Sequence, residues 1–139
     1  MINRVEKLSL LSEMIAFAKY DKDIKRIEYN FLLGVAKQLE ITREDFEYLI
    51  DNPVTYTHLK SHSERIVQFH RLVLLMNIEQ EFGEENENNS VGVIKLYNFG
   101  LRMGLSHESI TKVLYLMESF PNKIVPPDVL IDIFKTQYN

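Results

Sequence analysis

Five carboxylate residues in two segments of the chain have the residue types and spacing to hold a metal ion. Asp21, Asp23 and Glu28 lie between one predicted helix and the next, and Glu79 and Glu81 lie in a later segment. Carboxylate oxygens are the ligands that Ca²⁺ and Mg²⁺ prefer, and a cation would relieve the repulsion within such a cluster. The alternative is that Asp21 or Asp23 caps a helix while the others are solvated, because acidic residues also favour helix N-termini.

Two further groups of polar residues offer weaker metal chemistry. His58 and His62 stand four residues apart, but Pro53 places them in a predicted linker, and the HExxH pattern of zinc proteases is absent. The acidic segment 79–89 lacks the alternating Asp and Asn residues and the central Gly of a calcium-binding EF-hand loop. Partly buried or exposed histidines and a solvated loop are therefore the favoured interpretations.

Tyrosines supply the remaining candidate surface. Four of them could form a partner-binding patch or could rim the core with their hydroxyls in water: Tyr20, Tyr29, Tyr48 and Tyr56. The chain has no glycine-rich phosphate loop, nucleophile elbow or recognisable Ser-His-Asp set. The sequence therefore predicts a protein that is not an enzyme.

Composition narrows the class of protein. The chain has 139 residues, no cysteine and a formal net charge of −4, which fits one domain without disulfides or thiolate metal sites. The acidic balance argues against nucleic-acid binding, which needs a basic footprint. No apolar run approaches the ~18 residues of a membrane span, and the N-terminal segment lacks the apolar core of a signal peptide. We therefore expect a cytoplasmic protein with neither a nucleic-acid nor a membrane partner.

The elements that must position these residues are all predicted to be helices. Apolar residues recur at helical spacing, and no segment shows the alternation typical of a strand. The seven predicted helices cover about residues 3–19, 25–39, 43–51, 63–82, 90–103, 107–119 and 126–137. Thr42, Ser63 and Ser106 are expected N-caps, Pro53 and Pro121 end helices, and Pro127 opens the last one.

The predicted helices repeat. At an offset of 64 residues Leu32 aligns with Leu96 and Thr42 with Ser106, and the first helix aligns with the fourth at an offset of 58. The alternative is that any two amphipathic helices can be slid into agreement. We predict an all-α single domain over 1–139, a bundle of about seven helices with an internal pseudo-twofold duplication of a three-helix unit. Its parts are repeat one at about 3–51, a linker at 52–62, repeat two at about 63–119, and the C-terminal helix.

One spacing pattern resembles a known family. Asp21 follows an apolar helix, Ile24 comes three residues later, Glu28 comes seven later, and the next helix ends at Leu39 to Ile41. These residues resemble the TerB-like tellurite-resistance family, in which a helix ending in Ala-Asp-Gly precedes an aliphatic residue, a Glu and a Leu-Gly-Ile helix end at the same spacings. The resemblance covers about residues 8–118.

The resemblance implies an all-helical bundle with pseudo-twofold symmetry and an acidic surface proposed to bind metal ions. It also implies a role in tellurite or other stress responses, and some members are associated with phage defence or act as co-chaperones. Lys22 and Glu40 stand where the family has glycine, and Gly92 stands where repeat two would carry a counterpart of Glu28. The carboxylates of repeat one are therefore the better supported set.

The sequence thus predicts a non-enzymatic accessory domain that binds a divalent cation, Ca²⁺ or Mg²⁺, or a protein partner through an acidic face. A helical protein-interaction module without a metal ion is the alternative, and a metal-dependent enzyme is a distant one. The sequence leaves open whether the chain forms a homo-oligomer.

Overall fold

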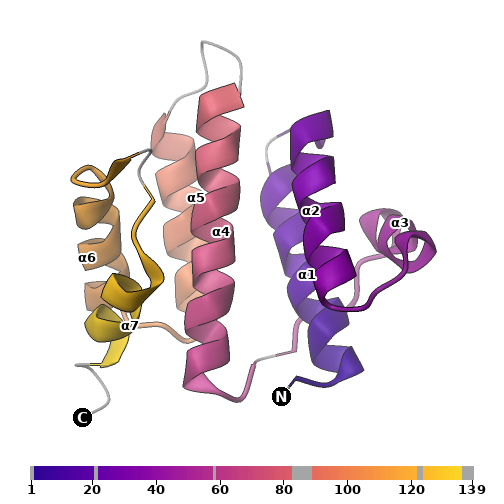
Figure 1. Cartoon of the computed structure of the whole chain (residues 1–139), viewed down its shortest axis with the longest axis horizontal. Coiled ribbons are helices and arrows are strands. Elements are labelled where there is room, and N and C mark those ends of the chain that lie inside the picture. Colours follow the sequence, from indigo (N-terminus) through magenta and orange to yellow (C-terminus); the bar gives the residue numbers. More distant parts are fainter. Residues whose placement is uncertain (1, 21, 58, 83–88, 122–123, 136–139) are drawn as a thin grey trace. The chain divides into compact units, whose positions relative to one another are not determined.

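The computed structural model of the chain describes residues 2–20, 22–57, 59–82, 89–121 and 124–135. These residues form seven α-helices and no strand, which confirms the all-α prediction (Figure 1). The helices are α1 (Arg4–Lys19), α2 (Arg26–Gln38), α3 (Arg43–Asp51), α4 (His62–Phe82), α5 (Asn89–Arg102), α6 (His107–Met117) and α7 (Pro127–Lys135). In this part of the chain every helix is too short or too polar to serve as a membrane span.

The chain divides into two compact units. Unit 1 is Met1–Leu59 and contains α1, α2 and α3, and unit 2 is Lys60–Asn139 and contains α4 to α7. The boundary falls inside the linker predicted for residues 52–62. The single-domain organisation and the internal duplication stay predictions.

Unit 1 is a cluster of three helices in which each helix contacts the other two. Its buried apolar side chains recur at the three- and four-residue spacing of one helix face: Leu11, Met14 and Ala18 on α1, Leu32 and Ala36 on α2, and Phe46 and Leu49 on α3. Burial of such faces is the main favourable term in folding a small helical unit.

Local capping fixes where the helices of unit 1 begin. Asn3 Oδ1 accepts a hydrogen bond from Glu6 N at 2.8 Å, and Asn3 N donates to Glu6 Oε1 at 3.1 Å. This reciprocal capping box satisfies two donors at the start of α1 and holds the buried Glu6 carboxylate. Thr42 Oγ1 accepts from Asp45 N at 3.1 Å, so Thr42 is the N-cap of α3, as predicted.

The segment after α3, here called the strap (residues 53–57 and 59), belongs to unit 1, and His58 lies outside the described residues. Ser12 Oγ on α1 accepts a hydrogen bond from Val54 N at 3.1 Å. Ser9 Oγ accepts from Thr57 N at 2.7 Å and donates to Thr57 O at 3.3 Å. Leu59 is buried at the end of the strap. Most of the predicted linker is therefore anchored on α1.

Unit 2 is a ring of four helices in which α4 and α6 each contact α5 and α7. Its buried apolar residues include Phe69, Leu72 and Met76 on α4, Leu96, Phe99 and Met103 on α5, Ile110 and Val113 on α6, and Leu130 and Ile133 on α7. Helix α5 packs tightly at Gly100, where an added Cβ would lie 2.7 Å from Ile110 Cδ1 on α6 and 3.0 Å from Phe69 Cε1 on α4.

The helix ends of unit 2 match two predictions and correct a third. Ser106 Oγ accepts from Ser109 N at 3.0 Å, which makes Ser106 the N-cap of α6, and Pro127 is the first residue of α7. Helix α4 begins at His62, and Ser61 Oγ accepts from Glu64 N at 3.4 Å. The cap of α4 is therefore Ser61 and not the predicted Ser63.

Candidate functional site

The five predicted metal-ligating residues have different surroundings. Asp21 lies outside the described residues, and Glu81 lies in α4, where its side chain is outside the described part of the structure. Asp23 is exposed in the loop before α2. Glu28 and Glu79 are the two whose side chains are both described and buried. Among the five candidates, the structure therefore gives buried side-chain contacts only for Glu28 in unit 1 and Glu79 in unit 2.

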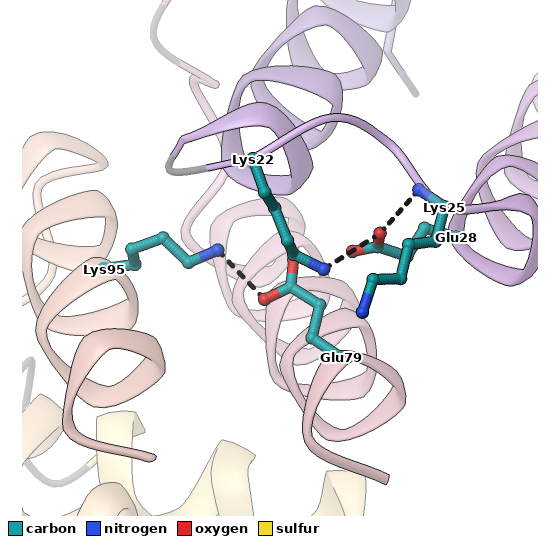
Figure 2. A network of polar contacts seen from close by, with 5 residues as sticks. All are labelled: Lys22, Lys25, Glu28, Glu79 and Lys95. Atoms are coloured by element: carbon teal, nitrogen blue, oxygen red, sulfur yellow. Dashed lines mark hydrogen bonds and ion pairs between the residues drawn. The ribbon is translucent and has the colours of Figure 1, made fainter. Parts of the chain in front are cut away.

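Glu28 lies in the first turn of α2, and its side chain is 0 % exposed. Figure 2 shows its carboxylate with Lys22 and Lys25: Oε1 accepts from Lys22 Nζ at 3.1 Å and from the backbone N of Lys25 at 2.9 Å. Lys25 is the N-cap residue of α2, so the interpretation that Asp23 caps this helix is wrong, whereas Asp21 lies outside the described residues. The carboxylate of Glu28 reaches back to satisfy the first N–H group of the helix, where the helix dipole also favours a negative charge.

The second oxygen of Glu28 has a different environment. Oε2 is buried, and it has no hydrogen-bond partner among the described residues. A buried acceptor without a partner costs free energy, so the ammonium group on Oε1 is the main compensation for burying this charge. In the sequence, Lys22 stands out only because TerB-like proteins have a glycine at that position. Its position six residues before a glutamate in a first helical turn was the available signal.

Glu79 on α4 forms the corresponding buried ion pair of unit 2. Its Oε2 lies 2.9 Å from Nζ of Lys95 on α5, with the side chains 6 % and 1 % exposed (Figure 2). Sequence reasoning missed Lys95, although it lies directly before buried Leu96 and four residues before buried Phe99, on the apolar side of the predicted helix. A lysine at that register needs a carboxylate partner, since an isolated buried ammonium is costly.

Among the described residues, no group of three or more Asp, Glu or His side chains is placed to hold a metal ion. Instead, a lysine of the same unit contacts each of the two buried carboxylates. The binding of Ca²⁺ or Mg²⁺ by the five predicted residues stays a prediction.

A different acidic surface, which the sequence reasoning did not single out, lies on the outer side of α3. We call it the α3 face; its four members are exposed and follow the spacing of one helix stripe: Glu44, Glu47, Tyr48 and Asp51. The Tyr48 side chain is among the most exposed of the larger apolar side chains, at 67 %. The other predicted tyrosines differ: Tyr20 is also exposed, whereas Tyr29 and Tyr56 are half-buried.

Glu47 connects the α3 face to α2. Tyr29 Oη donates to Glu47 Oε1 at 2.6 Å, Arg43 Nε donates to the same oxygen at 3.2 Å, and the Tyr29 ring packs on Phe46 with centroids 5.3 Å apart. The hydrogen bond from Tyr29, followed by the one from Arg43, lowers the pKa of Glu47. The same contact with Glu47 raises the pKa of the Tyr29 hydroxyl. This carboxylate is therefore engaged within unit 1.

The other charged members of the α3 face have no such engagement. Glu44 and Asp51 are exposed, and neither has a hydrogen-bond or ion-pair partner in the described part of the chain. Asp45, beside the face, is paired with Arg4 at 2.9 Å. Two solvent-facing carboxylates therefore flank an exposed tyrosine ring on one short helix.

The histidine candidates are described only in part. His58 lies outside the described residues, and His62 and His70 lie on α4, eight residues apart. Burial, followed by the nearby charge of Arg71, lowers the pKa of His70. Such a shift is typical of a partly buried structural histidine and does not require a ligand.

Comparison of the chain with protein-family models, with curated proteins and with solved structures finds no match.

Proposed function

We propose that this chain is a non-enzymatic helical accessory domain that binds a basic segment of a protein partner through the α3 face. The observation that carries the proposal is the exposed ring of Tyr48 between the exposed carboxylates of Glu44 and Asp51, which have no partner among the described residues. This is the interaction-module alternative raised by the sequence, placed on an acidic face different from the one predicted.

The chemistry of the α3 face favours a cationic partner. Exposed carboxylates attract lysine and arginine side chains over about a Debye length, which raises the rate of encounter. An aromatic ring adds a surface on which an alkyl stem or a guanidinium can stack. Tyrosine is also enriched at protein interfaces, because it contributes large area at a low cost in side-chain entropy.

The outer side of α6 can be compared with the α3 face. Its residues at the same helix positions are Glu108, Thr111, Lys112 and Tyr115, so an exposed tyrosine lies there beside charges of both signs. Tyr115 is 79 % exposed, more than Tyr48. Exposure alone therefore does not distinguish the two surfaces, whereas the signs of the charges do, because the charged members of the α3 face are all carboxylates.

The wider biological setting is part of the proposal. A role in a tellurite-type or other stress response is proposed only from the resemblance of the spacing of Asp21, Ile24 and Glu28 to the TerB-like pattern. Within such a response the chain would act as a binding partner of another protein.

The test is a selection of random linear peptides on the immobilised chain, followed by affinity measurements at two salt concentrations. We expect the enriched peptides to be rich in Lys and Arg and to bind more weakly at high salt. Tyr48→Ala and Glu44→Lys should each weaken binding about tenfold or more, because truncating a central interface residue costs ~1–2 kcal/mol.

Matched controls come from α6. Tyr115→Ala and Glu108→Lys make the same changes on the other outer surface and should leave binding unchanged. All four residues are exposed, so stability should shift by no more than about 0.5 kcal/mol. Enriched peptides without excess positive charge, or binding that is insensitive to the α3 changes, would refute the proposal.

A further inference from the structure

The exposed carboxylates of the α3 face that have no partner among the described residues lie along the axis of α3. Glu44 and Asp51 are seven residues apart in this helix, so their backbone positions are about 10.5 Å apart along the axis and about 20° apart around it. The exposed Tyr48 ring stands between them, four residues after Glu44 and three before Asp51. This spacing is that of the stripe through which two packed helices meet.

The carboxylates on the two sides of this stripe are already paired within unit 1. Successive helix residues are about 100° apart, so Asp45 projects to one side of Glu44 and Glu47 to the other. Asp45 Oδ2 lies 2.9 Å from Arg4 Nη2, and Glu47 Oε1 accepts from Arg43 Nε at 3.2 Å. A cationic partner therefore meets carboxylates that unit 1 leaves without a partner when it lies along α3, but not when it lies across it.

The two ends of the stripe differ in their relation to the helix dipole. Glu44 lies in the first turn of α3, where the dipole favours a negative charge. Asp51 is the last residue of α3, where the dipole opposes a negative charge, and the last turn carries no basic residue. The carboxylate of Asp51 therefore gains nothing from the local structure. A cation from a partner at this end would be attracted both by the carboxylate and by the last carbonyl groups of the helix.

We propose that the basic segment of the partner is a helix that lies along α3, with Lys or Arg at positions i and i+7 opposite Glu44 and Asp51. The inference rests on the proposed function and specifies its partner. Residues on one side of a helix recur at the same ~10.5 Å, whereas those on one side of an extended strand recur at multiples of about 6.6 Å. A side chain at i+3 or i+4 of the partner then faces the Tyr48 ring, on which an alkyl stem or a guanidinium stacks.

The test compares two peptides of identical composition by NMR titration against the full chain. Both are helix-forming peptides of Ala and Gln with two lysines, placed at i and i+7 in one and at i and i+5 in the other. The second spacing sets the lysines about 140° apart on a helix, so only one can face α3. We expect the i, i+7 peptide to bind about three- to fivefold more tightly, the effect of one exposed ion pair. The chemical shifts of the bound peptide should be those of a helix.

Asp51→Asn separates a binding role from a structural one. It should abolish the preference for the i, i+7 peptide and at the same time raise the midpoint of thermal unfolding, because it removes a charge that the helix dipole opposes. Glu108→Gln on α6 also removes one exposed negative charge and is the matched control, with the preference unchanged.

Three results would overturn the helical partner: equal affinity for the two peptides, an extended backbone in the bound peptide, or a preference that survives Asp51→Asn. Each of these leaves the proposed function standing, since basic peptides would still bind. Binding of neither peptide also overturns the inference. The selection of random peptides then decides whether the proposed function fails with it, because that experiment assumes no conformation of the partner.

Discussion

The turn between α2 and α3 in unit 1 and the turn between α5 and α6 in unit 2 use the same backbone hydrogen bonds at a constant offset of 64 residues. Ile41 N donates to Ala36 O at 2.8 Å, and Leu105 N donates to Gly100 O at 3.1 Å. The residue before each donor is left-handed, with φ of 61° at Glu40 and 84° at Gly104. Both helices therefore end in a Schellman-type turn that satisfies their last carbonyl groups.

The helices that follow the two turns also begin alike. Thr42 and Ser106 are N-caps, and each hydroxyl accepts from the backbone N–H three residues later, at Asp45 and Ser109. The two helix–turn–helix segments are therefore specified by the same two local signals, a left-handed residue at one helix end and a capping hydroxyl at the next. The correspondence is local to these turns, and the internal duplication of the whole chain stays a prediction.

The two segments differ at residues that do not take part in the shared turn. The α3 face is acidic around Tyr48, whereas the matching positions of α6 carry charges of both signs. The lysines of the two ion pairs differ too: Lys22 pairs with a glutamate six residues away, and Lys95 joins two helices. The same turn geometry is therefore compatible with different charges on the outer surface and in the buried ion pairs. Partner binding must therefore be sought in the residues that the two segments do not share.

The largest expected effect is the loss of the buried ion pair of unit 2. Lys95→Met removes the ammonium group that lies 2.9 Å from the Glu79 carboxylate, in surroundings where both side chains are nearly inaccessible. Removing one member of a buried pair typically costs about 3–5 kcal/mol, because the remaining charge is left in apolar surroundings. Denaturant unfolding followed by circular dichroism should show this decrease in the free energy of unfolding.

Lys22→Met is the matched change in unit 1, and it should cost less. The Lys22 side chain is 17 % exposed, and Glu28 keeps the hydrogen bond from the Lys25 backbone after the substitution. A larger loss of stability in Lys22→Met than in Lys95→Met would reverse this ranking of the two buried pairs.

A smaller effect is expected at Gly100, where α5 packs tightly against Ile110 of α6. Gly100 corresponds to Ala36 of unit 1 at the same offset, yet a methyl group at Gly100 would lie 2.7 Å from Ile110 Cδ1. We expect Gly100→Ala to lower the free energy of unfolding by about 1–3 kcal/mol through overpacking. Gly34→Ala is the control, because an added Cβ there has nothing within 4 Å. It should raise stability by about 0.5–1 kcal/mol, since alanine is the better helix former. Equal effects of the two substitutions would mean that the close approach at Gly100 carries no energetic cost.

Much of the fold could be predicted because its determinants are local. Thr42, Ser106 and Pro127 act within one helical turn of their own positions, and periodic apolar residues identify the buried face of each helix. The cap of α4 was misplaced because Ser61 and Ser63 are equivalent by residue type. Only the backbone path, which starts the helix at His62, distinguishes them.

The candidate site was harder to predict because ion pairing depends on which side chains are brought together. The acidic residues were identified by type and spacing, but the partners Lys22 and Lys95 were not. Lys95 lies 16 residues from Glu79 in sequence, on another helix, and no local rule joins them. The α3 face was missed for the opposite reason. Residue type and spacing do not show which exposed carboxylates have partners, and in the described part of the chain Glu44 and Asp51 have none.

The difference between Glu40 and Gly104 predicts a smaller pair of opposite effects. A left-handed φ costs a residue with a side chain about 1–2 kcal/mol relative to glycine, which adopts it freely. Glu40→Gly should therefore raise the free energy of unfolding by up to about 1 kcal/mol, and Gly104→Ala should lower it by a similar amount. Thermal and denaturant unfolding of both variants measure the two changes. Destabilisation by Glu40→Gly would indicate that the Glu40 side chain makes a contact worth more than the backbone strain.

The smallest expected effect is a pH dependence confined to unit 1. The hydrogen bonds from Tyr29 and then Arg43 lower the pKa of Glu47 from its ordinary 4.5, so the folded state binds fewer protons there than the unfolded state. The stabilisation is fully present above that ordinary value and is lost as the pH falls through the folded pKa. It is small because the groups are solvent-exposed. The matching residue of α6 is Thr111, which does not titrate, so no equivalent loss is expected there. Signals of the Tyr29 ring, followed by NMR from about pH 6 down to about pH 3, should change in the parent and stay nearly constant in Glu47→Gln. A transition that persists in Glu47→Gln would assign the pH dependence to another group and remove this distinction between the two segments.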